Sequence, residues 1–185
     1  MALELTALSW LAAYVAMLVA AVWRDATARR IPNWAVLPGA VLALALSIAH
    51  GGIGFGSSMS GLVAGLAVLL PFRLLRVMGA GDVKLLAAVG AFVGFPGVLR
   101  VALIAFLAGG VMSLAWAIRF RNVRAVLRNV RAGLCTTLAA VATGKLPRAG
   151  DLPVTAVRVP YALAIATGAT AYAFLSGNPG WNMPA

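Results

Sequence analysis

The strongest constraint on the fold is the length of the runs without a charged residue. Leu5–Trp23 contains no charge, and neither does the much longer run Trp34–Phe72. A transmembrane helix needs about 20 mostly apolar residues, so the first run is long enough for one crossing and the second for two. Charged residues make up only 10% of the chain, against about 25% in a soluble domain. Because so few charges cannot cover a surface in water, the composition predicts an integral membrane protein.

Turn-forming and basic stretches divide the apolar sequence into six segments. The glycine-rich stretch 51–56 splits the second run, and Pro96-Gly97 separates two later segments. We therefore predict an all-α, polytopic membrane protein with about six transmembrane helices in a single membrane-embedded domain, 1–185. The expected spans are about 5–23, 34–49, 57–72, 83–95, 98–118 and 160–176, with a polar cytoplasmic segment at 119–159.

The distribution of basic residues predicts the orientation. If the first loop is cytoplasmic and the spans alternate, 14 of the 15 Lys and Arg residues fall on the cytoplasmic side, and only Arg100 falls outside. Cytoplasmic loops of membrane proteins carry this kind of excess. We expect a multi-pass protein of the cytoplasmic (inner) membrane with both termini outside.

A basic helix is predicted inside the polar segment. The arginines at 121, 124, 128 and 131 recur every three or four residues, so they share one face of a helix. This pattern is typical of an amphipathic helix that lies on anionic lipids at the cytoplasmic surface. Nucleic-acid binding is the alternative explanation of a net charge of +11. We favour lipid and expect no nucleic-acid partner, because membrane helices need basic anchors in any case.

The counts of His and Cys restrict the chemistry. With one Cys and one His, the chain has neither a cysteine-rich zinc site nor the paired-histidine zinc motif of metalloproteases. The predicted topology also puts His50 and Cys135 on opposite sides of the membrane. We expect no metal and no cofactor.

Two of the four carboxylates are expected at the same membrane depth. Glu4 falls at the outer end of the first span, and Asp151 lies in a loop with prolines and glycines. Asp25 follows the first span and Asp82 precedes the fourth, so both lie at the cytoplasmic boundary. Two carboxylates a few ångströms apart do not both ionise readily, and such a pair shares one proton. If the two helices pack together, Asp25 and Asp82 form a catalytic dyad of this kind.

The surroundings of Asp82 favour a functional role. The fourth span is short, so Asp82 is expected slightly below the membrane surface, where ionisable groups are costly. Gly79 and Gly81 have no side chains and would let an extended peptide approach beside it. The alternative is structural: Asp82 caps an interfacial helix, and the glycines belong to a flexible loop.

The two aspartates lie in segments that resemble the motifs of one family. Asp25-Ala-Thr-Ala-Arg-Arg-Ile-Pro-Asn33 resembles the first aspartate motif of type IV prepilin leader peptidases. Gly79-Ala-Gly-Asp-Val-Lys-Leu85 resembles their second motif, which defines the Gly-x-Gly-Asp aspartyl intramembrane proteases. Pro160-Tyr-Ala-Leu-Ala-Ile165 is similar to a less specific motif that opens the last helix of these proteins.

This resemblance implies an activity and a substrate class. It implies an endopeptidase that removes short basic leaders from pilin-like precursors at the cytoplasmic face, just before a hydrophobic helix, with Asp25 and Asp82 as the catalytic pair that activates water. Longer relatives have a four-cysteine domain that methylates the new N-terminus. This sequence contains only Cys135, so we expect no methyltransferase activity. The short form resembles peptidases of Flp (tight-adherence) pilus systems, and also archaeal preflagellin peptidases.

Roles for four neighbouring residues follow from elementary chemistry. Pro32 is expected to fix the turn before the second span, and Asn33 to cap that helix. Lys84 is expected to favour the ionised form of Asp82 through its field. Arg24 either orients Asp25 or, as we favour, anchors the first span at the membrane surface.

Close helix packing is predicted from small residues. Gly61-x-x-x-Gly65 and Gly90-x-x-x-Gly94 have the spacing that lets two helix backbones approach each other in a membrane.

Two other functions remain open at this point. A small transporter or channel would use Asp25 and Asp82 to relay protons or bind a cation. Both carboxylates at one boundary, and no inverted repeat, argue against it. A non-catalytic assembly protein would bind a pilin-like precursor without cleaving it.

Overall fold

The computed structural model describes residues 2–48, 53–74, 78–119, 124, 128, 131, 132, 135 and 161–176. These residues form helices and connecting turns, with no strand among them. The helices are α1 (Ala2–Ala28), α2 (Asn33–Ser47), α3 (Phe55–Leu74), α4 (Ala80–Val93), α5 (Gly97–Arg119) and α7 (Tyr161–Leu175). Each overlaps one expected span, and the all-α polytopic prediction is confirmed. The predicted basic helix falls almost wholly outside the described residues, as do Asp151 and Pro160.

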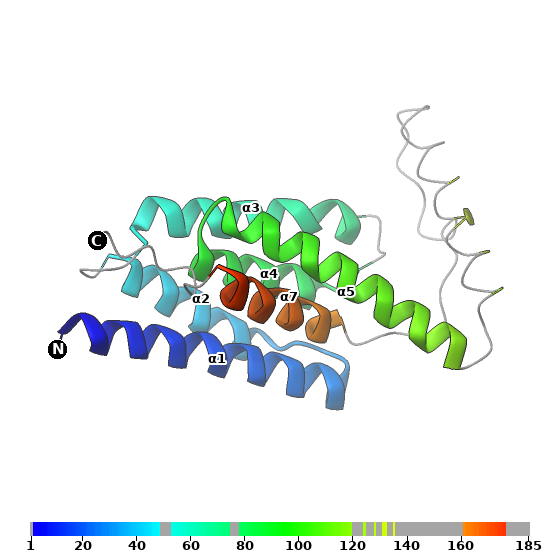
Figure 1. Cartoon of the computed structure of the whole chain (residues 1–185), viewed down its shortest axis with the longest axis horizontal. Coiled ribbons are helices and arrows are strands. Elements are labelled where there is room, and N and C mark those ends of the chain that lie inside the picture. The colour runs from blue at the N-terminus through cyan, green and yellow to red at the C-terminus, as the bar shows by residue number, and fades with distance from the viewer. Residues whose placement is uncertain are drawn as a thin grey trace.

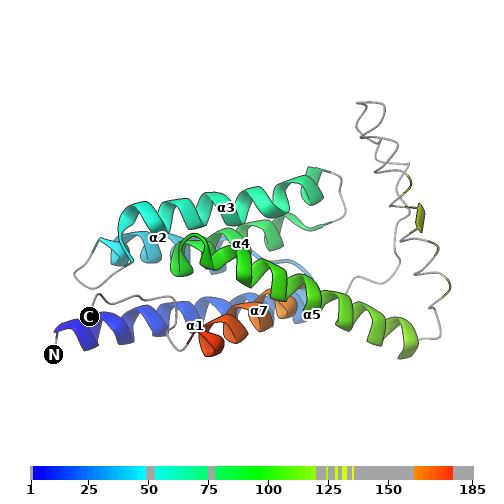
Figure 2. The ribbon, with the colours of Figure 1, turned by 45° about the horizontal axis from the view of Figure 1, so that its top comes forward.

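Successive helices alternate in direction. Figure 1 shows that the C-terminal ends of α1, α3 and α5 lie at the same end of the bundle as the N-terminal ends of α2, α4 and α7. The turned view of Figure 2 keeps this arrangement and shows α7 beside α1. Asp25 is near the C-terminal end of α1 and Asp82 is near the N-terminal end of α4. Both helix ends therefore lie at the same end of the bundle.

The outward-facing surface is apolar. By length and composition, three described helices can cross a membrane, at Leu8–Ala28, Phe55–Leu74 and Gly97–Trp116, and α2 and α7 are shorter apolar helices. On α5, Leu103, Leu107 and Val111 are each more than 60% exposed. A helix with apolar residues on its outer side as well as its inner side is suited to lipid. The chain is a membrane protein.

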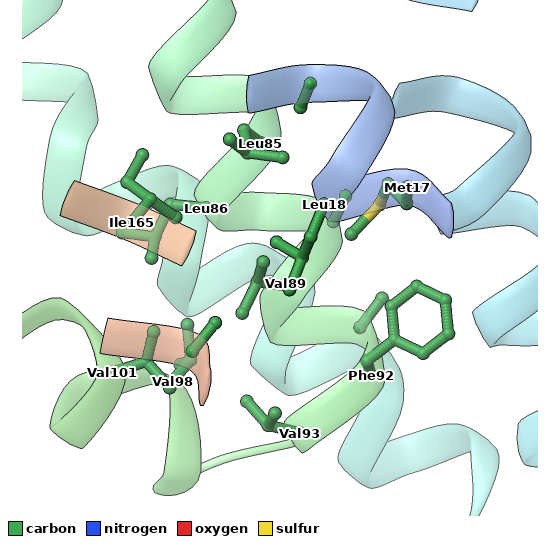
Figure 3. Close-up of a cluster of buried hydrophobic side chains, with 14 of the residues drawn as sticks. Met17, Leu18, Leu85, Leu86, Val89, Phe92, Val93, Val98, Val101 and Ile165 are labelled. Carbon is green, nitrogen blue, oxygen red and sulfur yellow. The ribbon is translucent and has the colours of Figure 1, made fainter. Parts of the chain in front are cut away.

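Helix α4 occupies the centre of the bundle. It contacts each of the other five described helices, and every residue from Leu85 to Val93 is buried. Figure 3 shows its Leu85, Leu86 and Val89 packed among side chains of α1, α5 and α7. From Leu85 to Val93, α4 is apolar around its whole circumference, as suits a helix that other helices surround. The position of its first turn, which carries Asp82, is thereby fixed by packing.

Glycines bring α3 and α4 into backbone contact. Gly61 lies against the backbone of Gly90 and Gly94. A Cβ atom on Gly65 would stand 2.6 Å from the carbonyl oxygen of Leu86. The predicted role of the two Gly-x-x-x-Gly motifs in close packing is confirmed.

This contact predicts a specific loss of stability. Gly65→Ala is expected to lower the free energy of unfolding by about 1–3 kcal/mol, because the added methyl group meets backbone that cannot rotate away. Thermal unfolding in detergent measures the change. Gly56→Ala on the same helix is the matched control, since a Cβ there meets nothing within 4 Å. Equal stability of the Gly65→Ala variant and the wild type would contradict the packing.

Candidate active site

Asp25 is held by two helices. Helix α1 continues past the expected end of the first span to Ala28, so Asp25 lies in its last turns. The side chain is only 9% exposed. Its Oδ2 atom accepts a hydrogen bond of 3.0 Å from the backbone N–H of Ala162 in the first turn of α7. A backbone donor at a helix N-terminus stabilises a negative charge, so the contact with α7 favours the ionised form of Asp25, while the burial of this side chain opposes it.

Asp82 is the third residue of α4, the position from which an acidic side chain reaches back to the start of a helix. Gly79 is the N-cap residue, in an extended conformation, and its backbone N–H donates a hydrogen bond to the Asp82 carboxylate. This is the acidic half of a capping box. A Cβ atom on Gly79 would stand 3.0 Å from Oδ2 of Asp82. The Asp82 carboxylate therefore packs close to Gly79, where a side chain would crowd it.

The two carboxyl groups influence each other. Asp82 precedes the expected span 83–95, and burial raises the pKa of its carboxyl group above the ordinary value. The charge of Asp25 raises this pKa further, and the hydrogen bond from Gly79 lowers it. The structure thus places the sequence-predicted pair at one end of the bundle, within electrostatic range of each other.

Two contacts join the aspartate-bearing segments. Ile31, in the loop after α1, packs on Gly81, where a Cβ atom would stand 2.7 Å from that of Ile31. Lys84 Nζ donates a hydrogen bond of 2.8 Å to Oδ1 of Asn33 at the start of α2. The loop that follows Asp25 is therefore attached to the helix turn that carries Asp82.

The structure corrects one expectation for the neighbouring residues. Asn33 does not cap α2: the N-cap residue is Pro32, with φ −76° and ψ 151° and no side-chain cap hydrogen bond. The amide oxygen of Asn33 instead accepts a hydrogen bond from Lys84, and the expected effect of the Lys84 charge on Asp82 stays a prediction. Ile31 packs beside Gly81, and the expected approach of a peptide at Gly79 and Gly81 stays a prediction.

Arg24 has an aromatic partner. Its guanidinium carbon lies 5.7 Å from the centroid of the Trp34 ring, within cation–π range. An interaction with a surface aromatic residue suits the favoured role of an anchor, while the alternative role of orienting Asp25 stays a prediction.

The first turn of α7 is the part of the site that sequence reasoning missed. Ala162 contributes only its backbone N–H, which no side-chain pattern reveals. Tyr161 interacts electrostatically with Asp82, and its hydroxyl group is buried without a hydrogen-bond partner among the described residues. The sequence signal for this turn is the Pro160–Ile165 motif, which by itself indicates a helix start and no particular chemistry.

These features define a class of site: one buried and one half-buried carboxyl group at the end of a membrane helix bundle, an arrangement suited to shared-proton chemistry. A comparison with protein families matches residues 12–114, more than half of the chain, to the type IV leader peptidase family. The chain belongs to this family, and membership indicates a peptidase. The matched region contains both aspartates and ends before α7. Comparisons with curated proteins and with solved structures gave no match.

The raised pKa predicts how stability depends on pH. Ionised Asp82 is disfavoured in the folded protein, so it costs stability as the pH rises from the ordinary Asp pKa through the raised value. Asp82→Asn removes that cost and leaves an oxygen for the Gly79 N–H. We expect the variant to melt at a higher temperature than the wild type at pH 8 in detergent. The difference should vanish at a pH below the ordinary Asp pKa. A variant that melts lower than the wild type at pH 8 would contradict the burial of this charge.

Proposed function

We propose that this chain is a membrane aspartyl endopeptidase that removes the short basic leader from type IV pilin-like precursors at the cytoplasmic face. One observation carries the proposal: Asp25 and Asp82, from helices far apart in sequence, lie together at one end of the bundle and interact electrostatically. Membership of the type IV leader peptidase family supports the reaction class. Zinc, other metals and cofactors take no part in the proposed chemistry.

The proposed reaction is direct attack by water on a peptide bond. Asp25, which accepts the Ala162 N–H, is the ionised member, and Asp82, with its raised pKa, is the protonated one. Asp25 takes a proton from water as the water oxygen bonds to the carbonyl carbon, and the carbonyl oxygen receives the Asp82 proton. When the C–N bond breaks, the proton on Asp25 passes to the leaving nitrogen. Asp82 recovers a proton as the new carboxyl group forms.

The basic end of the bundle suits the proposed location. Among the described residues, Arg29, Arg73 and Arg119 all lie at the end where the two aspartates meet, whereas Arg100 lies near the start of α5 at the opposite end. Positive residues concentrate on the cytoplasmic side of membrane proteins. The precursor would present its leader in the cytoplasm and its hydrophobic helix in the membrane, which places the bond between them at the depth of the pair.

Removing either acid tests the mechanism. Asp25→Asn and Asp82→Asn are each expected to abolish cleavage, since an amide can neither accept the proton of water nor supply one. The assay is co-expression with a precursor that has a short basic leader directly before a hydrophobic helix, and the mature N-terminus is read by mass spectrometry. Membrane insertion and melting temperature control for folding. Cleavage retained in either variant would refute the dyad.

The shared proton predicts a bell-shaped pH profile. Activity requires one ionised and one protonated carboxyl group, so kcat/KM falls on the acid side as the pair gains its second proton and on the alkaline side as it loses its last one. Because the pKa of Asp82 is raised, the alkaline limb should lie well above the pH at which a free aspartate ionises. The purified protein in detergent provides this profile. An alkaline limb at the ordinary Asp pKa would argue against this assignment.

A further inference from the structure

We infer that the hydroxyl group of Tyr161 is a third catalytic group, which donates a hydrogen bond to the oxygen of the peptide carbonyl under attack. This inference rests on the proposed function and adds a residue to the same site. It concerns α7, which lies outside the residues that match the family.

The position of Tyr161 follows from its neighbour in the chain. Ala162 donates its backbone N–H to Asp25 at 3.0 Å, so the first turn of α7 is in direct contact with one member of the carboxylate pair. Tyr161 is the preceding residue, and its phenol interacts electrostatically with Asp82. Adjacent residues at the start of α7 therefore interact with the two aspartates: Ala162 with Asp25, and the Tyr161 side chain with Asp82.

The Tyr161 hydroxyl is a buried donor that has no acceptor in the described part of the chain. Its oxygen is shielded from solvent and has no hydrogen-bond partner among the described residues. A buried polar group without a partner costs about 1–3 kcal/mol, and such groups in native proteins call for an explanation. An acceptor that arrives with the substrate supplies one.

A glycine on α5 holds the ring in place. A Cβ atom on Gly109 would stand 2.7 Å from Cε2 of Tyr161, so the ring packs closely on a position that has no side chain. The ring is fixed by this packing while its hydroxyl group is unpaired. A preorganised donor of this kind needs no rearrangement when negative charge develops on a carbonyl oxygen.

Several polar groups at this end have partners among the described residues, whereas the buried Nε of Arg24 has no hydrogen-bond partner there. Lys84 is bonded to Asn33, and Arg24 lies against Trp34. The backbone N–H groups of Gly79 and Ala162 are bonded to the carboxylates themselves. Of the two buried donors at this end that lack a described partner, Arg24 Nε and the Tyr161 hydroxyl, we choose Tyr161, because it interacts electrostatically with Asp82, the carboxyl group proposed to protonate the reacting oxygen.

Tyr161→Phe tests the inference. It removes the hydroxyl group and keeps the ring on Gly109. We expect kcat to fall by about 10²-fold, as for the loss of one donor to a developing oxyanion. KM and the alkaline limb of the pH profile should stay as in the wild type, because the contact forms with the reacting oxygen instead of Asp82. The assay uses the purified full chain and the leader-bearing precursor.

The matched control is Tyr172→Phe, which removes the other tyrosine hydroxyl of α7 more than two turns away and should retain full activity. Wild-type kcat in Tyr161→Phe, an equal loss in Tyr172→Phe, a loss confined to KM, or a shifted alkaline limb would each overturn the inference. A wild type that does not cleave the precursor refutes the proposed function and this inference with it. An active wild type with a fully active Tyr161→Phe variant refutes the inference alone.

Discussion

The burial of α4 is the constraint on which the site depends. This helix is enclosed by all five other described helices, and the backbone contact of Gly65 with Leu86 leaves no freedom to slide along α3. Because α4 is packed along its length, the position of its first turn is fixed as well. Asp82, three residues into α4, is therefore placed by the core and not by a loop. Groups that do chemistry need such rigid support, because small displacements cost large factors in rate.

Asp25 reaches the same point by a different route. Its helix runs several residues beyond the expected end of the apolar span, which carries the carboxylate to the first turn of α7. The contacts of Ile31 with Gly81 and of Lys84 with Asn33 then join the following loop to α4. Each aspartate-bearing segment thus positions the other, and neither half of the site is complete alone.

The predictable and unpredictable parts of this structure differ in physical origin. Uncharged runs such as Leu5–Trp23 predict helices because lipid leaves the backbone no other way to satisfy its hydrogen bonds. The pairing of Asp25 with Asp82 was predictable from their common depth. The contact between Asp25 and Ala162 was not, since it joins positions 137 residues apart through a backbone group. The capping role given to Asn33 was wrong because its tertiary partner, Lys84, lies outside the local pattern.

The alternation of helix directions explains why Asp25 and Asp82 lie at this end of the bundle. Two helix N-termini, those of α4 and α7, meet at the pair and give one N–H each, from Gly79 to Asp82 and from Ala162 to Asp25. The positive ends of these helices stabilise one negative charge. A second charge is opposed by the first and by burial. The fold therefore opposes a second charge at this site, and the proposed hydrolysis by two carboxyl groups uses the state with one proton and one charge.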